Sequence, residues 1–149
     1  MSLEQWVEYD WLRAEPSSPR EIRDLFEIIT RALKDAQVDA ISDDLRFQAA
    51  FGAALTAANA ALRASGYRTR VQARHHQKIV ESLEFTVKPD PKLIQKLQIF
   101  SRKRNAVNYD AAGNVSRQDL EQAIQVANEL QQKVALWVQH NHPDLMMRS

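Results

Sequence analysis

The segment 99–110, IFSRKRNAVNYD, contains the densest run of positive charge in the sequence. Arg102, Lys103 and Arg104 are consecutive, and the amide of Asn105 follows them. A guanidinium group holds phosphate through two parallel hydrogen bonds, and an ammonium group holds it as a point charge. The segment therefore predicts a site for an anionic ligand near the end of a helix. The alternative is a solvated charge cluster that the helix dipole favours there, with a capping or buried amide beside it.

A second group that could do chemistry is Arg74, His75 and His76. An imidazole titrates near neutral pH, so it can move a proton or line a polyanion site. Neighbours on a helix point about 100° apart, so the adjacent histidines are not expected to bind one metal ion together. His140 and His142 give an equally weak metal pattern. We therefore predict no metal and no cofactor, and histidines that pack within the fold remain the alternative.

The charge is unevenly distributed along the chain, although the net charge is only +1. Residues 62–104 contain 11 lysines and arginines against 3 acidic residues, whereas residues 1–61 and 105–149 are net acidic. Such a segment favours an anionic partner, namely RNA, a nucleotide or an acidic protein surface. The alternative is that the acidic flanks pack beside the basic middle and neutralise it.

The composition predicts one helical domain over residues 1–149. Of these residues 44% are hydrophobic and 26% charged, and only three are glycine, so helix is favoured and disorder is not. The absence of cysteine removes disulfides and thiolate metal sites and fits a reducing compartment. No signal peptide and no apolar run of about 20 residues is visible, so we expect a cytoplasmic protein without a membrane segment.

The elements that must position these residues are predicted from caps and apolar spacing. A short amphipathic helix is expected over residues 3–13, and no strand pattern is long enough to indicate a sheet. Longer helices are expected after caps at Ser18, Ser42, Asp90 and Ser116, and a further one over residues 71–85. The predicted fold class is all-α, an antiparallel bundle of about five helices.

The order of these parts resembles the HEPN domains, a family of helical proteins associated with nucleotides and RNA. The likeness covers Ser18 to Gln139. It rests on the alanine-rich helix that ends at Gly66, the Arg74-His75-His76 helix start, the Arg104-Asn105 motif and the serine-capped last helix. The resemblance implies a small HEPN-like bundle that commonly forms a homodimer. It also implies RNA or nucleotide binding, with metal-independent ribonuclease activity in the active members.

The chain departs from the family's signature at one position. Active members carry an arginine, usually followed by a polar residue, and a histidine four to six residues later. Tyr109 stands where that histidine is expected, and no histidine occurs between Arg104 and Gln139. Tyrosine, with an ordinary pKa of about 10, is a poor proton acceptor. We therefore expect phosphate binding without efficient catalysis. The predicted phosphate-binding residues are Arg102, Lys103, Arg104, Asn105, Arg74 and His75.

Two alternatives remain open at this point. The chain could be a ribonuclease toxin or defence effector in which His75 or His76 supplies the missing proton carrier. The candidate catalytic residues are then Arg104, Asn105, Tyr109 and His76. It could instead dock a nucleotidyltransferase-like antitoxin, with Tyr109 as a target for nucleotide transfer.

Overall fold

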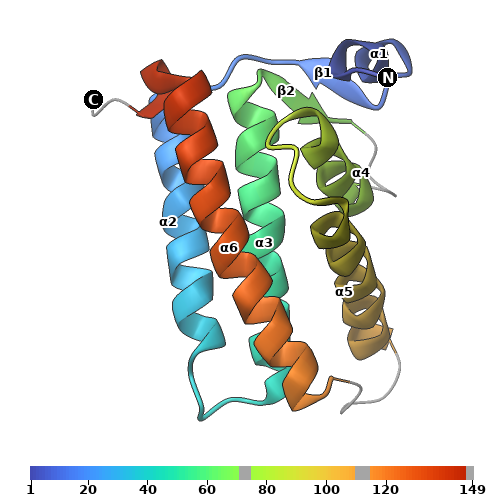
Figure 1. Cartoon of the computed structure of the whole chain (residues 1–149), viewed down its shortest axis with the longest axis vertical. Helices are drawn as coiled ribbons and strands as arrows, with labels where there is room; N and C mark the ends of the chain where they lie inside the picture. The colour runs from blue at the N-terminus through green and yellow to red at the C-terminus, as the bar shows by residue number, and fades with distance from the viewer. Residues whose placement is uncertain (71–74, 110–114, 147–149) are drawn as a thin grey trace.

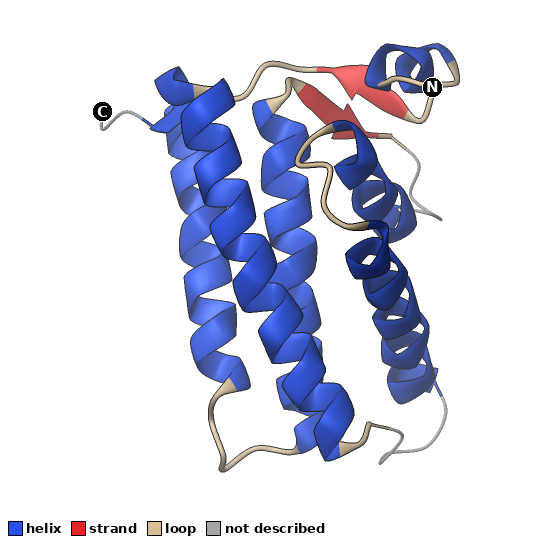
Figure 2. Cartoon of the chain, in the orientation of Figure 1, coloured by secondary structure: helices blue, strands red, loops and turns tan. Residues whose placement is uncertain are grey.

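The computed structural model describes residues 1–70, 75–109 and 115–146, with the backbone alone for residues 105–109. This part of the chain forms an all-α bundle with a small two-stranded sheet, which confirms the predicted fold class (Figures 1 and 2). The elements are α1 (Leu3–Glu8), β1 (Leu12–Ala14), α2 (Pro19–Ala36), α3 (Asp43–Ala64), β2 (Tyr67–Thr69), α4 (His75–Ser82), the 3₁₀ helix η1 (Leu83–Phe85), α5 (Pro91–Tyr109), α6 (Arg117–Asn141) and the 3₁₀ helix η2 (Pro143–Met146).

Helix α3 is the centre of the bundle. It packs against α2 and α6 on one side and against α4 and α5 on the other (Figure 1). Its alanines, from Ala50 to Ala64, are mostly buried, and their small side chains let neighbouring helices approach closely. A helix that is apolar on nearly all sides is stable only in the interior of a fold. The alanine-rich sequence of α3 is therefore explained by its position.

The predicted helix starts are confirmed at three serines. The hydroxyls of Ser18, Ser42 and Ser116 each accept a hydrogen bond from the backbone N–H three residues later. Asp119 returns a bond to the backbone N–H of Ser116, which completes a capping box. Gly66 follows the end of α3 with a φ of +92°, a conformation that favours glycine.

The predicted helix over residues 3–13 is wrong in its second half. Helix α1 ends at Glu8, Asp10 adopts a φ of 65°, and β1 then pairs antiparallel with β2 (Figure 2). Leu12, fully buried, lies opposite Thr69 in this pairing. The strand was missed because its partner lies far along the sequence, so no local pattern reports the pairing.

The helix predicted over residues 71–85 is helical wherever it is described, and its last turn is a 3₁₀ helix. Helix α4 begins at His75 and passes into η1 at Leu83, and residues 71–74 lie outside the described residues. Helix α5 runs from Pro91 to Tyr109, so the Arg104-Asn105 motif lies inside the helix, one turn before its last residue. None of the described helices combines the length and the apolar character that a membrane span needs.

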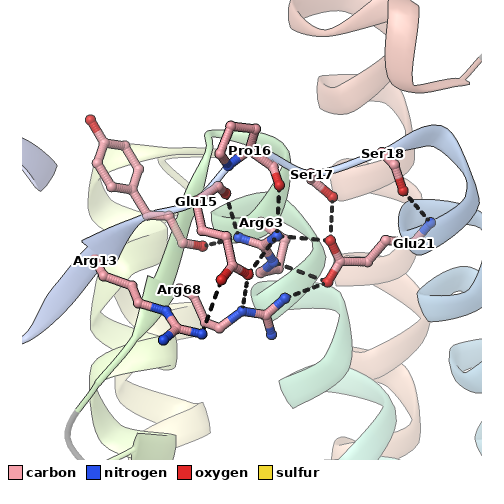
Figure 3. Close-up of polar contacts among 9 residues, drawn as sticks. Arg13, Glu15, Pro16, Ser17, Ser18, Glu21, Arg63 and Arg68 are labelled. Atoms are coloured by element: carbon pink, nitrogen blue, oxygen red, sulfur yellow. Dashed lines mark hydrogen bonds and ion pairs between the residues drawn. The ribbon is translucent and has the colours of Figure 1, made fainter.

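A buried arginine joins four segments of the fold. The side chain of Arg63 in α3 is 1% exposed, and all five of its N–H donors have acceptors (Figure 3). Two carboxylate oxygens of Glu21 in α2 accept at 3.1 and 2.8 Å. The carbonyl oxygens of Glu15, Pro16 and Tyr67 accept the other three bonds. A buried guanidinium with every donor satisfied fixes how these segments meet.

The carboxylate of Glu21 is held in its charged form by this arrangement. Its pKa is lowered from the ordinary value of 4.5 to about 2. Hydrogen bonds from Arg63 are the main cause, bonds from Ser17 and Arg68 add to it, and partial burial opposes it. Arg68 also bonds Glu15, so two arginines and two glutamates form one cluster, here called the Arg63 cluster.

We predict that Glu21→Gln destabilises the fold at pH 7 by on the order of 2 kcal/mol, because charge-assisted bonds to a buried guanidinium are lost. A carboxylate whose pKa is depressed on folding contributes stability that is fully present above its unfolded pKa and is lost as pH falls toward the folded value. The difference in unfolding free energy between wild type and variant should therefore shrink between pH 4.5 and about 2. Urea denaturation across this range measures it.

The matched control is Glu27→Gln, a neutralisation at an exposed position of the same helix. This variant should stay within about 0.5 kcal/mol of wild type at every pH. Equal losses in the two variants would contradict the assigned role of Glu21.

Candidate nucleic-acid interface

Helix α5 carries five cationic residues and no acidic residue between Pro91 and Tyr109. Its start is fixed by Asp90, whose carboxylate accepts a hydrogen bond from the backbone N–H of Lys92 at 2.9 Å. Leu93, Leu97 and Phe100 bury one side of the helix, and the ring of Phe100 meets that of Phe47 edge to face. This packing holds the cationic residues on a fixed scaffold.

The structure shows which cations of the basic segment 62–104 pair with acidic residues among the described parts of the chain. The acidic N-terminal flank pairs with Arg63 and Arg68 in the Arg63 cluster, and Asp10 pairs with Arg70 at 3.1 Å. Lys103 pairs with Asp119 of α6 at 3.1 Å. Five other cationic residues of the basic segment form no ion pair with any described residue: Lys88, Lys92, Lys96, Arg102 and Arg104. Neutralisation by the flanks therefore holds for part of the segment, and the anionic partner stays a prediction that rests on these five cations.

A groove of about 350 Å³ lies between α4 and α5. Gln77 and Val80 line it from α4, and Gln98, Ser101 and Arg102 line it from α5. The three α5 residues share one side of the helix because they are spaced by three and four positions. The groove thus combines an arginine, a hydroxyl and two amides over an apolar base, an arrangement suited to an anion that also offers hydrogen bonds.

The charge of Arg104 in α5 acts on the imidazole of His76 in α4. Arg104 is half-buried, and no described carboxylate pairs with it. Burial lowers the pKa of His76, and the positive charge of Arg104 and the neighbouring His75 lower it further. The lowered pKa favours the neutral form of the His76 imidazole at pH 7. The imidazole can then accept a proton, and an anion placed beside it would favour its charged form.

The other predicted residues are placed differently. Lys103 is directed toward α6 and does not line the α4–α5 groove. His75 is exposed, its Nδ1 lies 2.6 Å from the hydroxyl of Thr69, and its ring centre is 5.4 Å from that of His76. This contact ties the first turn of α4 to β2. Arg74 lies outside the described residues.

The backbone of Asn105 and Tyr109 belongs to α5, but their side chains lie outside the described part of the structure. Since the helix is continuous, Tyr109 lies five positions beyond Arg104, a rotation of about 140° around the helix axis. Their roles in a site stay predictions.

Sequence reasoning missed Gln77, Gln98 and Ser101 in the groove. Glutamine and serine are common on exposed helix faces, so their type gives no signal. Reasoning also missed Arg63, although a signal was present. Between Leu45 and Ala64 the only charged residues are Arg46 and Arg63, and a charge in such an apolar helix needs an internal partner.

No protein-family model, curated protein or solved structure matches the chain. Among the residues that the structure describes, no three histidine, aspartate or glutamate side chains are grouped to hold a metal ion.

We predict that Arg104→Gln raises the pKa of His76, because removal of the neighbouring positive charge makes the imidazolium easier to form. A titration of the histidine ring protons by NMR measures it. Lys103→Gln is the control, since its ammonium lies against Asp119 and is not among the causes of the shift. A His76 pKa that is identical in wild type and Arg104→Gln would contradict this electrostatic link.

Proposed function

We propose that this chain binds the phosphate group of a nucleotide, either free or within RNA, at the α4–α5 groove. The observation that carries the proposal is Arg102, an exposed guanidinium that lines a groove and has no acidic partner among the described residues. A guanidinium that is free of carboxylates can bind a phosphate through two hydrogen bonds. The resemblance to HEPN domains favours the same class of ligand.

Neighbouring groups support the same ligand chemistry. Ser101 can donate a hydrogen bond from its hydroxyl, and Arg104 adds a second positive charge on the same helix. Lys92 and Lys96 extend the positive field along α5 without acidic residues in that helix. Such a field raises the local concentration of anions and speeds their association.

We predict that the double variant Arg102→Gln/Arg104→Gln weakens binding by about 10- to 100-fold, because two charge-assisted contacts to phosphate are lost. Fluorescence anisotropy with a labelled single-stranded RNA and calorimetry with adenosine 5′-monophosphate measure the two sources of phosphate separately. Binding of the RNA alone would identify a strand as the ligand. Binding of both would identify the nucleotide unit.

The control for this test is Arg20→Gln/Arg31→Gln, which removes the same charge from exposed positions of α2 that form no ion pair with described residues. It should bind within about twofold of wild type. Unchanged binding by the α5 variant, or an equal loss in the α2 control, would contradict a site at the groove.

A second candidate function is metal-independent RNA cleavage, as in a toxin or defence effector. The observation that supports it is His76, whose lowered pKa favours a neutral imidazole at pH 7, with the charge of Arg104 acting on it. A neutral imidazole can take the proton of a ribose 2′-hydroxyl, and the arginine can hold the adjacent phosphate. The 2′-oxygen then bonds to phosphorus, the bond from phosphorus to the 5′-oxygen breaks, and the leaving 5′-oxygen takes a proton from water or from the imidazolium.

If this second function holds, wild type cleaves RNA in the presence of EDTA, and His76→Ala lowers the rate by at least about 100-fold. His140→Ala, at an exposed position of α6, should cleave like wild type. Gel analysis of several RNA substrates measures the rates. Intact RNA in every wild-type digestion would remove this candidate and leave phosphate binding unaffected.

The homodimer and the nucleotidyltransferase-like partner both follow from the family resemblance. They stay predictions, as does the role of Tyr109 as a target for nucleotide transfer.

A further inference from the structure

We infer that Gln77 recognises the base of the bound nucleotide, while Arg102 holds its phosphate. This inference rests on the proposed phosphate site and adds a specificity-determining residue to it. The ligand inferred in this way is a nucleoside monophosphate unit. Its planar base would contact Gln77, and its anionic phosphate would contact Arg102.

The orientation of the Gln77 amide is fixed by Glu81. The Nε2 group of Gln77 donates a hydrogen bond to Oε1 of Glu81 at 3.1 Å. An ionised carboxylate can only accept, so the amide nitrogen must face it. The carbonyl oxygen of Gln77 receives no hydrogen bond from any described residue. That oxygen is therefore a pre-oriented acceptor at the wall of the groove.

The position of the Glu81 side chain is in turn fixed by Lys78, which packs against two tryptophans. Its other carboxylate oxygen pairs with Nζ of Lys78 at 3.2 Å. The ammonium group of Lys78 lies 3.6 Å from the ring centre of Trp11 and 5.0 Å from that of Trp6. A cation between two aromatic faces is attracted by both rings. Because the two indoles meet at an interplanar angle of 75°, they restrict the ammonium group from two directions.

The aromatic end of this series is itself buried. Trp6 is 4% exposed and meets the ring of Phe85 edge to face at 5.3 Å. A continuous series of contacts thus runs from the core to the groove through Trp6, Lys78, Glu81 and Gln77. Hydrogen bonds in such a network hold one another in place, so the Gln77 carbonyl is more rigid than a lone surface amide.

The opposite wall fits the remaining parts of a nucleotide. Gln98 faces the groove from α5 with both a donor and an acceptor, while the buried Val80 closes the base of the groove from α4. Arg102 lies one turn beyond Gln98, about 6 Å along the helix. At about 350 Å³ the groove is at the small end of ligand sites, a size that suits one nucleotide.

A site built to hydrogen-bond a ligand group discriminates against an analogue that lacks that group. Each of the four RNA bases presents an N–H donor on its edge, and ribose 5-phosphate presents none. The ratio of the two affinities therefore reports base recognition separately from phosphate binding.

The experiment compares the adenosine, cytidine, guanosine and uridine 5′-monophosphates with ribose 5-phosphate by calorimetry on the full chain. We expect at least one nucleotide to bind about tenfold more tightly than ribose 5-phosphate. Gln77→Leu should reduce this ratio to about one. Glu81→Gln should reduce it severalfold, because a glutamine at this position can also donate and no longer fixes the Gln77 amide.

Gln95→Leu is the matched control, since Gln95 is exposed on α5 and does not line the groove. It should keep the wild-type ratio. A structural defect in Glu81→Gln would weaken both ligands together and leave the ratio unchanged, which would contradict the positioning role.

The outcomes separate this inference from the proposal on which it rests. If ribose 5-phosphate binds as tightly as every nucleotide, or if Gln77→Leu keeps the preference, base recognition is wrong and the phosphate site stands. If neither the nucleotides nor ribose 5-phosphate binds wild type, recognition of a nucleoside monophosphate is wrong. If labelled single-stranded RNA also fails to bind, the phosphate site is wrong as well.

Discussion

The buried guanidinium of Arg63 is the interaction on which the arrangement of the fold depends. Its five donors need five acceptors, and they come from Glu21 in α2, the loop before α2, and Tyr67 in β2. A buried ion pair often adds little net stability, because desolvation offsets the attraction. Here the ion pair selects one arrangement of the segments, because a shift of any one of them would leave a buried N–H donor of Arg63 without an acceptor. The arginine thereby fixes how the N-terminal arm, α2, α3 and β2 meet at one end of the bundle.

The same cluster decides where the positive charge of the chain remains available. The carboxylates of the N-terminal segment are engaged with Arg63, Arg68 and Arg70, so the first part of the basic segment is neutralised within the fold. Helix α5 packs on the side of α3 opposite α2 and α6, and its own sequence contains no carboxylate. The basic residues of the segment 62–104 thus fall into two groups in the fold. Arg63, Arg68 and Arg70 pair with carboxylates at one end of the bundle, and the cations of α5 lie beside the groove.

The N-terminal arm contributes to both regions. Its carboxylates engage the Arg63 cluster, and its indoles at Trp6 and Trp11 hold Lys78 of α4. Through Glu81, that lysine is connected with Gln77 at the groove. A short strand pair and two aromatic rings therefore link the end of the bundle to the surface where we propose phosphate binding. Without residues 1–16, Arg63 and Arg68 would lose Glu15 and keep Glu21 of α2, and Lys78 of α4 would lose both indoles.

The sequence by itself determined the helical class and the caps at Ser18, Ser42 and Ser116, because these depend on residues within a few positions of one another. It also contained a signal for Arg63, an isolated charge in an apolar helix. Only the tertiary structure decided the β1–β2 pairing, the partners of each cation and the groove between α4 and α5. These features join residues that are far apart in the chain, and their geometry depends on how whole helices pack. Local periodicity cannot predict how whole helices pack. In the structure Lys103 pairs with Asp119 of α6, whereas its neighbour Arg102 lines the groove without an acidic partner among the described residues.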